Sequence, residues 1–278
     1  MRYNERELRR LGDGDLAEIV AGVHDAFKKR HPDLNDIVLP SQKTSAKEAE
    51  AIITPTDKDR LLRDAMRPFV QEYSAAKVLT PDLIDHTWQG IWRVIGERVE
   101  YEYQVPTCDR TTEELEKLKK EGRAVLLLPS DIYTPDGLVR LGRAFPLMRS
   151  WITNPKEAVK ISHGSTEGGS IGIEMSLDAP YRTSKGYRQQ ELVDRITADG
   201  RSGQRFPTYL VGSQFSQFLT GQYFDINTWS RLPGSSYGGR MLHAYFYSDG
   251  VANVYDGYWS PRIQYPRLGG RSEGVKRA

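Results

Sequence analysis

The chain has 278 residues, of which 38% are hydrophobic and 27% charged, and its formal net charge is +2. This length and composition allow one large domain or two ordinary ones with an apolar core, and they argue against wholesale disorder. The single cysteine, Cys108, excludes an intramolecular disulfide framework and a zinc site built from several cysteines. We therefore expect a reducing, cytoplasmic setting.

The apolar runs of the sequence are too short for a membrane helix. The best one, AVLLLP at residues 124–129, is far below the roughly 18 apolar residues that such a helix needs. The first ten residues, MRYNERELRR, are charged and lack the apolar core of a secretory signal. We expect a soluble protein without a membrane partner.

Residues 1–105 are predicted to form a helical region. Apolar residues recur at helical spacing from residue 16 to residue 27, and Thr-Pro-Asp at residues 80–82 is a strong helix start. The apolar positions that follow this start share one face: Ile84, Trp88, Ile91 and Ile95. Pro68 predicts a kink or a split in the preceding helix. At residues 99–105 apolar and polar residues alternate, which predicts a half-buried strand.

Residues 106–278 are predicted to form a mixed α/β region. Thr111 is expected to cap a helix, and the apolar run at residues 124–129 is expected to be a strand buried on both faces. Residues 134–136, again Thr-Pro-Asp, start another helix. A Gly/Ser loop is predicted at residues 161–172 and a strand at residues 171–178. Ser184 is expected to cap a further helix.

Residues 205–259 are the densest in aromatic side chains. We expect a strand at residues 208–212, a helix at residues 214–224 and a loop at residues 231–240. A hairpin with an Asp-Gly turn at residues 249–250 follows, and no periodicity is evident beyond residue 260. The predicted class is therefore α+β: an N-terminal helical region followed by a mixed α/β region that ends in an antiparallel β-hairpin.

The two parts of the chain differ in charge. From residue 179 onward, 13 basic residues face 7 acidic ones, whereas residues 1–178 hold 26 basic and 30 acidic residues. Eleven of those 13 cations are arginines, and the same hundred residues hold 17 of the 28 aromatic residues. Such a region is typical of proteins with an anionic partner, and equally typical of an ordinary β-rich domain.

The first functional hypothesis is binding of single-stranded nucleic acid. Aromatic rings stack on bases while arginines meet phosphates, and both residue types are concentrated in the C-terminal region. The candidate residues are Arg182, Arg188, Arg231, Arg240, Tyr245 and Tyr247. The opposing interpretation is that the aromatic residues pack in the core of a sheet.

The alternative is a hydrolytic enzyme, with His163, Glu174, Asp178 and His243 as candidate catalytic residues. Glu174 and Asp178 would share a strand face but lie about 13 Å apart along it, too far to hold one metal ion together. Either could pair with a histidine instead. No cofactor is predicted, except that a nuclease of this kind would use Mg²⁺.

A third hypothesis is a non-catalytic module that binds another protein. Tyr, Trp and Arg dominate interface hot spots, and this interpretation needs no catalytic motif. The sequence leaves the three alternatives open.

Overall fold

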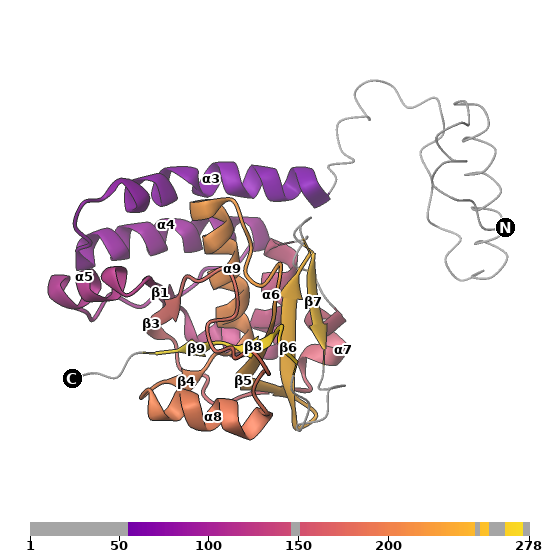
Figure 1. Cartoon of the computed structure of the whole chain (residues 1–278). Coiled ribbons are helices and arrows are strands. Elements are labelled where there is room, and N and C mark those ends of the chain that lie inside the picture. Colours follow the sequence, from indigo (N-terminus) through magenta and orange to yellow (C-terminus); the bar gives the residue numbers. More distant parts are fainter. Residues whose placement is uncertain (1–54, 146–150, 248–250, 256–264, 275–278) are drawn as a thin grey trace, which may run out of the picture. The chain divides into compact units, whose positions relative to one another are not determined.

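The computed structural model describes residues 55–145, 151–247, 251–255 and 265–274, where seven α-helices and two sheets form an α+β fold (Figure 1). The predicted class is confirmed. The helices predicted before residue 55 lie outside the described residues, and so does the predicted turn at residues 249–250.

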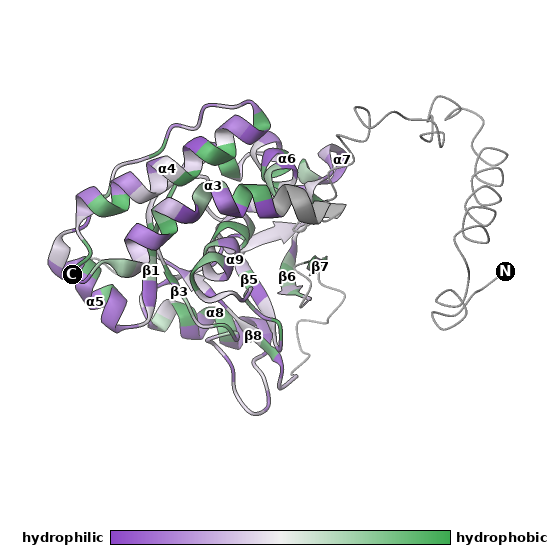
Figure 2. Cartoon of the chain, turned by 90° about the horizontal axis from the view of Figure 1, so that it is seen from above, coloured by the Kyte–Doolittle hydropathy of each residue, from purple (hydrophilic) through white to green (hydrophobic). Residues whose placement is uncertain are grey.

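Helices α3 (Pro55–Ala75) and α4 (Pro81–Val99) begin the described chain. Helix α3 runs uninterrupted through Pro68, so the predicted split is wrong. Pro68 lies on the exposed side of α3, where water can satisfy the carbonyl that loses its donor. Helix α4 begins as predicted, because the Thr80 side chain accepts a hydrogen bond from the Leu83 amide. Figure 2 shows polar and apolar residues alternating along both helices.

The strand predicted at residues 99–105 is also wrong. Helix α4 extends to Val99, and the Tyr101 amide closes its end by donating to the Gly96 carbonyl over 2.9 Å. The residues that follow have no regular secondary structure. Their alternation reflects a chain that runs over the surface with Tyr103 turned inward.

Two tryptophans of α4 join this helix to strand β1 (Arg123–Leu128). The indole N–H of Trp88 donates to the Val125 carbonyl over 3.0 Å, and that of Trp92 donates to the Leu127 carbonyl over 2.6 Å. Four residues of helix rise about 6 Å, and two residues of strand rise about 6.6 Å. The two spacings match, so helix and strand lie in register.

Sheet 1 is antiparallel and has the order β1-β3-β9-β4. Its members after β1 are β3 (Gly169–Glu174), β9 (Ser272–Glu273) and β4 (Ser202–Gly203). The buried strand predicted at β1 is confirmed, as is the capped helix before it, α5 (Thr112–Lys120). Asp178, predicted on a strand, lies beyond the end of β3.

Sheet 2 consists of β2 (Ile161–His163), β5 (Trp229–Tyr237), β6 (Arg240–Phe246), β7 (Ala252–Tyr255) and β8 (Leu268–Gly270). Neighbours are antiparallel except β8, which pairs with β5 in parallel. The predicted hairpin corresponds to β6 and β7. The loops predicted at residues 161–172 and 231–240 are wrong, since both segments contain strands. A register shift between Leu232 and Ser236 accommodates the Pro-Gly-Ser sequence inside β5.

Three helices lie beside these sheets: α6 (Pro135–Ala144), α7 (Pro155–Ala158) and α8 (Gln189–Ala198). Helix α6 starts at the predicted Thr-Pro-Asp signal, where the Thr134 hydroxyl accepts from the Gly137 amide over 3.1 Å. Helix α8 begins after Arg188, so Ser184 is not its cap.

Helix α9 (Phe206–Thr220) occupies the centre of the described fold (Figure 1). Phe215 contacts Trp88 of α4, Tyr209 stacks on Phe246 of β6, and Gly212 lies against Ile173 of β3. The strand predicted at residues 208–212 is wrong. A helix buried on all sides shows no apolar stripe, and its sequence therefore reads as a strand.

One hydrophobic core joins α3, α4 and α9 with residues of both sheets. The domain boundary that we placed between residues 105 and 106 stays a prediction. Among the described helices, none combines the length and the apolar character that crossing a membrane requires.

Candidate functional site

Three consecutive residues, Arg271, Ser272 and Glu273, each contact a charged side chain that is buried or largely buried. Arg271 pairs with Asp225, Ser272 donates to Glu174 over 3.0 Å, and Glu273 pairs with Arg205. All three residues are less than 5% exposed. The segment therefore connects sheet 1 to the N-terminus of α9 and to the start of sheet 2.

The Arg271–Asp225 pair is the most enclosed of these. Arg271 donates to both carboxylate oxygens of Asp225, over 2.9 and 3.1 Å. Tyr209 and Thr228 donate to the same carboxylate over 3.0 and 2.8 Å. Asp225 is 0% exposed and adopts a positive φ of 57°. A buried charge with this many partners is well compensated, which fits a structural role.

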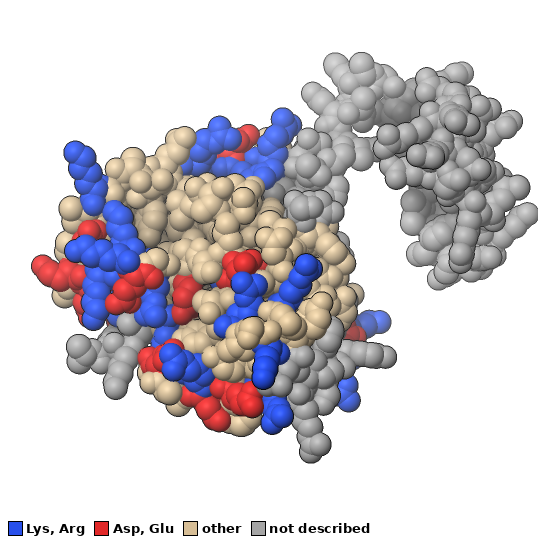
Figure 3. Space-filling view, viewed as in Figure 1, with Lys and Arg blue, Asp and Glu red and all other residues tan. Residues whose placement is uncertain are grey.

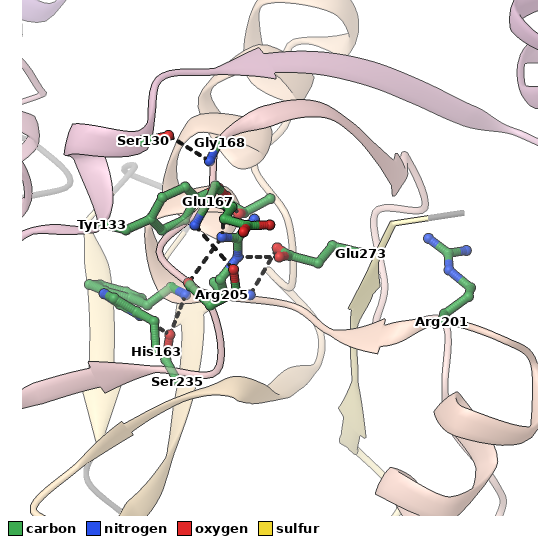
Figure 4. Close-up of polar contacts among 12 residues, drawn as sticks. Ser130, Tyr133, His163, Glu167, Gly168, Arg201, Arg205, Ser235 and Glu273 are labelled. Carbon is green, nitrogen blue, oxygen red and sulfur yellow. Dashed lines mark hydrogen bonds and ion pairs between the residues drawn. The ribbon is translucent and has the colours of Figure 1, made fainter. Parts of the chain in front are cut away.

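Arg205 lies between an aromatic ring and a carboxylate (Figure 4). Its guanidinium carbon is 3.7 Å from the centroid of the Tyr133 ring, and its Nε donates to Glu273. Its Nη1 donates to the carbonyls of Ser165 and Glu167 over 3.0 and 2.6 Å. These contacts hold the loop between β2 and β3 against the start of α9.

A cleft of about 360 Å³ opens beside Arg205 and Glu273. Glycines form much of its wall, among them Gly164, Gly203 and Gly234. Its charged lining groups are the ion pair and the exposed Glu167. Because Glu273 neutralises Arg205, the cleft offers a paired donor and acceptor and has no excess of positive charge.

His163, a predicted catalytic residue, lies next to this cleft. Its Nδ1 is 2.6 Å from the Ser235 hydroxyl, and that hydroxyl also accepts from the Phe206 amide over 2.8 Å. Burial and the nearby Arg205 charge lower the pKa of His163 to about 4. The histidine is therefore neutral at pH 7 and a weak general base. The Ser235 hydroxyl thus caps the first turn of α9 by accepting the hydrogen bond of its Phe206 amide.

Glu174 and Asp178 are not brought to a histidine. Glu174 pairs with the buried Arg201, and Asp178 pairs with Arg182 over 3.5 Å on the surface. In the ranges that the structure describes, no three His, Cys, Asp or Glu side chains are grouped to hold a metal ion. The hydrolase hypothesis stays a prediction, and the geometry adds nothing in its favour.

His243 and Arg231 meet in the interior. The Arg231 Nε donates to His243 Nε2 over 3.3 Å, and its Nη1 donates to the Tyr187 carbonyl over 2.5 Å. Each residue is 1% exposed. Burial, followed by the Arg231 charge, lowers the pKa of His243 to about 4. Arg231 is thus occupied inside the fold and is closed to a ligand in solution.

Tyr245 and Tyr247 belong to a group of rings on the outer side of sheet 2, which we call the aromatic face: Trp229, Tyr245, Tyr247 and Tyr255. Trp229 stacks on Tyr245 and Tyr255 with centroid distances of 4.9 and 5.9 Å and angles of 2° and 11°. Tyr247 meets Tyr245 edge-on at 5.1 Å. The neighbouring Ala244 and Phe246 point into the core, so alternation turns Tyr245 outward. Tyr247 is 47% exposed.

The other predicted arginines lie on the surface at separate places. Arg182 and Arg188 are exposed before α8, and Arg240 is exposed at the start of β6. Tyr245 lies five residues further along β6, about 16 Å away. Cationic and anionic side chains are interspersed on the surface that Figure 3 shows. The described arginines therefore do not form one basic groove on that side.

The candidate site residues chosen from the sequence did not include Arg205, Asp225, Trp229, Tyr255 or Glu273. The signal for Trp229 was its place among residues 205–259, which are the densest in aromatic side chains. The sequence gave no sign of the two ion pairs, because Asp225 is 46 residues from Arg271 and Glu273 is 68 residues from Arg205. No family model, curated protein or solved structure matches the chain.

Proposed function

We propose that the protein binds single-stranded nucleic acid in the cytoplasm, with bases stacking on the aromatic face. The observation that carries the proposal is the cluster of three near-parallel, half-buried rings, Trp229, Tyr245 and Tyr255, beside the exposed Tyr247. A base can extend such a stack whatever its identity, because every base has a π-face. Each stacked base contributes about 1–3 kcal/mol.

The hydroxyl groups of this face are held in place. Asn253 donates to the hydroxyls of Tyr245 and Tyr247, each over 3.1 Å, and Tyr245 donates to Tyr247 over 2.9 Å. Burial and these neighbouring tyrosines raise the pKa of Tyr245, so its ring stays neutral. A fixed, uncharged ring suits stacking, since little conformational entropy is lost when a ligand binds.

Two exposed arginines, Arg188 and Arg267, lie at or next to residues that hydrogen-bond to strand β5. The Trp229 amide donates to the Arg267 carbonyl over 2.8 Å, and the Arg267 side chain is exposed. Arg188 follows Tyr187, whose carbonyl accepts from Arg231 of the same strand as Trp229. We assign phosphate contacts to these two residues in place of Arg231 and Arg240.

The test is fluorescence anisotropy with labelled oligo(dT) and oligo(U). Binding is expected at low salt and should weaken steeply as salt rises. Trp229→Ala and Tyr245→Ala should each weaken it about tenfold. Tyr101→Ala is the matched control, since Tyr101 is 37% exposed and far from sheet 2 in the sequence.

Two outcomes would overturn the proposal. One is the lack of binding at low salt. The other is binding that the Tyr101 variant loses as much as the Trp229 variant. Retention of oligosaccharides without oligonucleotides would show that the rings stack on sugars instead.

A further inference from the structure

An amide side chain, that of Asn253, lies within the aromatic face. Asn253 is directly opposite Tyr245 in the pairing of β6 with β7. Its neighbours along β7, Ala252 and Val254, are buried in the core, so alternation along the strand turns Asn253 to the outer side together with Tyr255. The rings of this face therefore have a polar group beside them that can both donate and accept hydrogen bonds.

The hydrogen bonds of this amide run in one direction. Asn253 Nδ2 donates to the hydroxyl oxygens of Tyr245 and Tyr247, each over 3.1 Å, and the Tyr245 hydroxyl donates to that of Tyr247 over 2.9 Å. An amide nitrogen carries two hydrogens and a hydroxyl carries one. These three bonds use every hydrogen of the Asn253 amide and of the Tyr245 hydroxyl. The Tyr247 oxygen accepts two of the bonds and keeps its own hydrogen.

Two polar groups of this network are left for a ligand: the O–H of Tyr247 as a donor and Oδ1 of Asn253 as an acceptor. Neither has a further hydrogen-bond partner among the described residues. Both are accessible, since Tyr247 is 47% exposed and Oδ1 of the half-buried Asn253 reaches the surface. A donor and an acceptor are thus presented next to the rings.

The two groups are close enough to bind the same ligand atom. In an amide the oxygen lies about 2.2 Å from the nitrogen. Since Asn253 Nδ2 is 3.1 Å from the Tyr247 oxygen, Asn253 Oδ1 is at most about 5.3 Å from that oxygen. A ligand oxygen that makes two hydrogen bonds of about 2.8 Å can bridge such a distance.

A hydroxyl group fits this pair, because it accepts one hydrogen bond and donates another through a single oxygen. In a nucleic acid such a group is the 2′-hydroxyl of ribose, which DNA lacks. Phenol hydroxyls lie in the plane of their rings, and a sugar is attached in the plane of its base. A base stacked parallel to Tyr245 can therefore bring its ribose to the hydroxyl end of that ring.

We infer that Tyr247 and Asn253 recognise the 2′-hydroxyl of a ribose, so that the aromatic face prefers RNA to DNA. The 2′-hydroxyl oxygen accepts from the Tyr247 O–H and donates to Asn253 Oδ1. This inference rests on the proposed binding of single-stranded nucleic acid and names the class of nucleic acid that is bound. Two hydrogen bonds that DNA does not make correspond to a preference of about tenfold.

Fluorescence anisotropy with the full chain at low salt tests the preference. Labelled oligo(U) and oligo(dU) of equal length have the same bases and differ only in the 2′-hydroxyl. Oligo(U) should have a Kd about tenfold lower. A 2′-fluoro oligo(U) keeps the sugar pucker of RNA but has no hydrogen to donate, and it should bind like oligo(dU).

Variants locate the preference within the aromatic face. Tyr247→Phe keeps the ring and removes the donor, so the ratio of the two Kd values should fall toward one. Asn253→Ala removes the acceptor and should have the same effect on the ratio. Trp229→Ala removes a stacking ring but neither polar group, so it should weaken binding of both oligonucleotides by the same factor. Tyr101→Phe, the matched control for loss of an exposed tyrosine hydroxyl, should change neither Kd.

The outcomes separate this inference from the proposed function. If neither oligonucleotide binds, the proposed function fails, and the inference fails with it. Equal Kd values for oligo(U) and oligo(dU), both raised by Trp229→Ala, would overturn the inference alone. Binding of the 2′-fluoro oligonucleotide as tightly as oligo(U) would do the same, since sugar pucker would then explain the preference. So would a Tyr247→Phe variant that weakens binding of both oligonucleotides equally, as a purely structural hydroxyl would.

Discussion

The described arginines from residue 179 onward fall into two groups that differ in what they do. Arg201, Arg205, Arg231 and Arg271 are at most 7% exposed, and each donates hydrogen bonds inside the fold. The members of the second group are exposed: Arg182, Arg188, Arg195, Arg240 and Arg267. One residue type thus serves as an internal connector in one place and as a surface charge in another.

This difference changes the meaning of the basic composition. The excess of positive charge after residue 179 seemed to mark a surface for an anionic partner. Three of the four interior arginines have a carboxylate partner, and Arg231 has a histidine. Only the exposed group can meet a ligand, so the number of arginines overstates the charge that a partner would encounter.

Among variants that test this difference, the largest loss of stability is expected for a substitution of Arg271. Arg271→Ala leaves the Asp225 carboxylate buried without its cation, which should lower the free energy of unfolding by about 3–5 kcal/mol. Arg182→Ala, at an exposed pair, should leave it unchanged within measurement error. Urea denaturation measures both. Equal losses in the two variants would erase the distinction between interior and surface arginines.

A pH effect is expected next, at the Arg231–His243 contact. The folded pKa of His243 is about 4, below its ordinary value of about 6.5, so the unfolded chain takes up the proton first as pH falls. The stability from this group is complete above pH ~6.5 and is lost as pH falls toward 4, by up to about 3 kcal/mol. His243→Gln should reduce the pH dependence of denaturation in this range, and the part that remains includes the other buried histidine, His163, whose pKa is also about 4. An unchanged profile in His243→Gln would contradict the assignment.

The smallest effect concerns a hydrogen bond beside the buried ion pairs. Ser272→Ala removes the donor to Glu174 and should lower the free energy of unfolding by about 1 kcal/mol. Ser162→Ala removes a surface contact with Ser236 and serves as the control. Thermal unfolding of both variants measures the difference. A larger loss at Ser162 would show that exposure is a poor guide to the importance of these contacts.

The sequence predicted those parts of the fold that begin at a strong helix cap or consist of a continuous apolar run. Thr80, Thr111 and Thr134 start helices as expected, and the apolar run of β1 is a buried strand. The second half of helix α9 falls within the helix predicted at residues 214–224, whereas its first half was predicted as a strand, because a helix in the centre of a core has no polar side. Strand β9 was missed because two polar residues give no periodic signal.

The candidate sites were predicted less well, for a physical reason. Tyr245 and Tyr247 do lie on an outer face, as alternation along a strand requires. Arg231 is buried and donates to His243 of the paired strand β6 and to the Tyr187 carbonyl, and such contacts depend on a pairing register that is not visible in composition. The end of α4 was missed because residues 99–105 were interpreted as a strand.

The indole groups of Trp88 and Trp92 have a consequence beyond packing. Strand β1 is an edge strand of sheet 1. The unpaired backbone groups of an edge strand can pair with a strand of another molecule. Here the carbonyls of Val125 and Leu127 already accept hydrogen bonds from α4. The helix thereby shields a very apolar strand from edge-to-edge aggregation between chains.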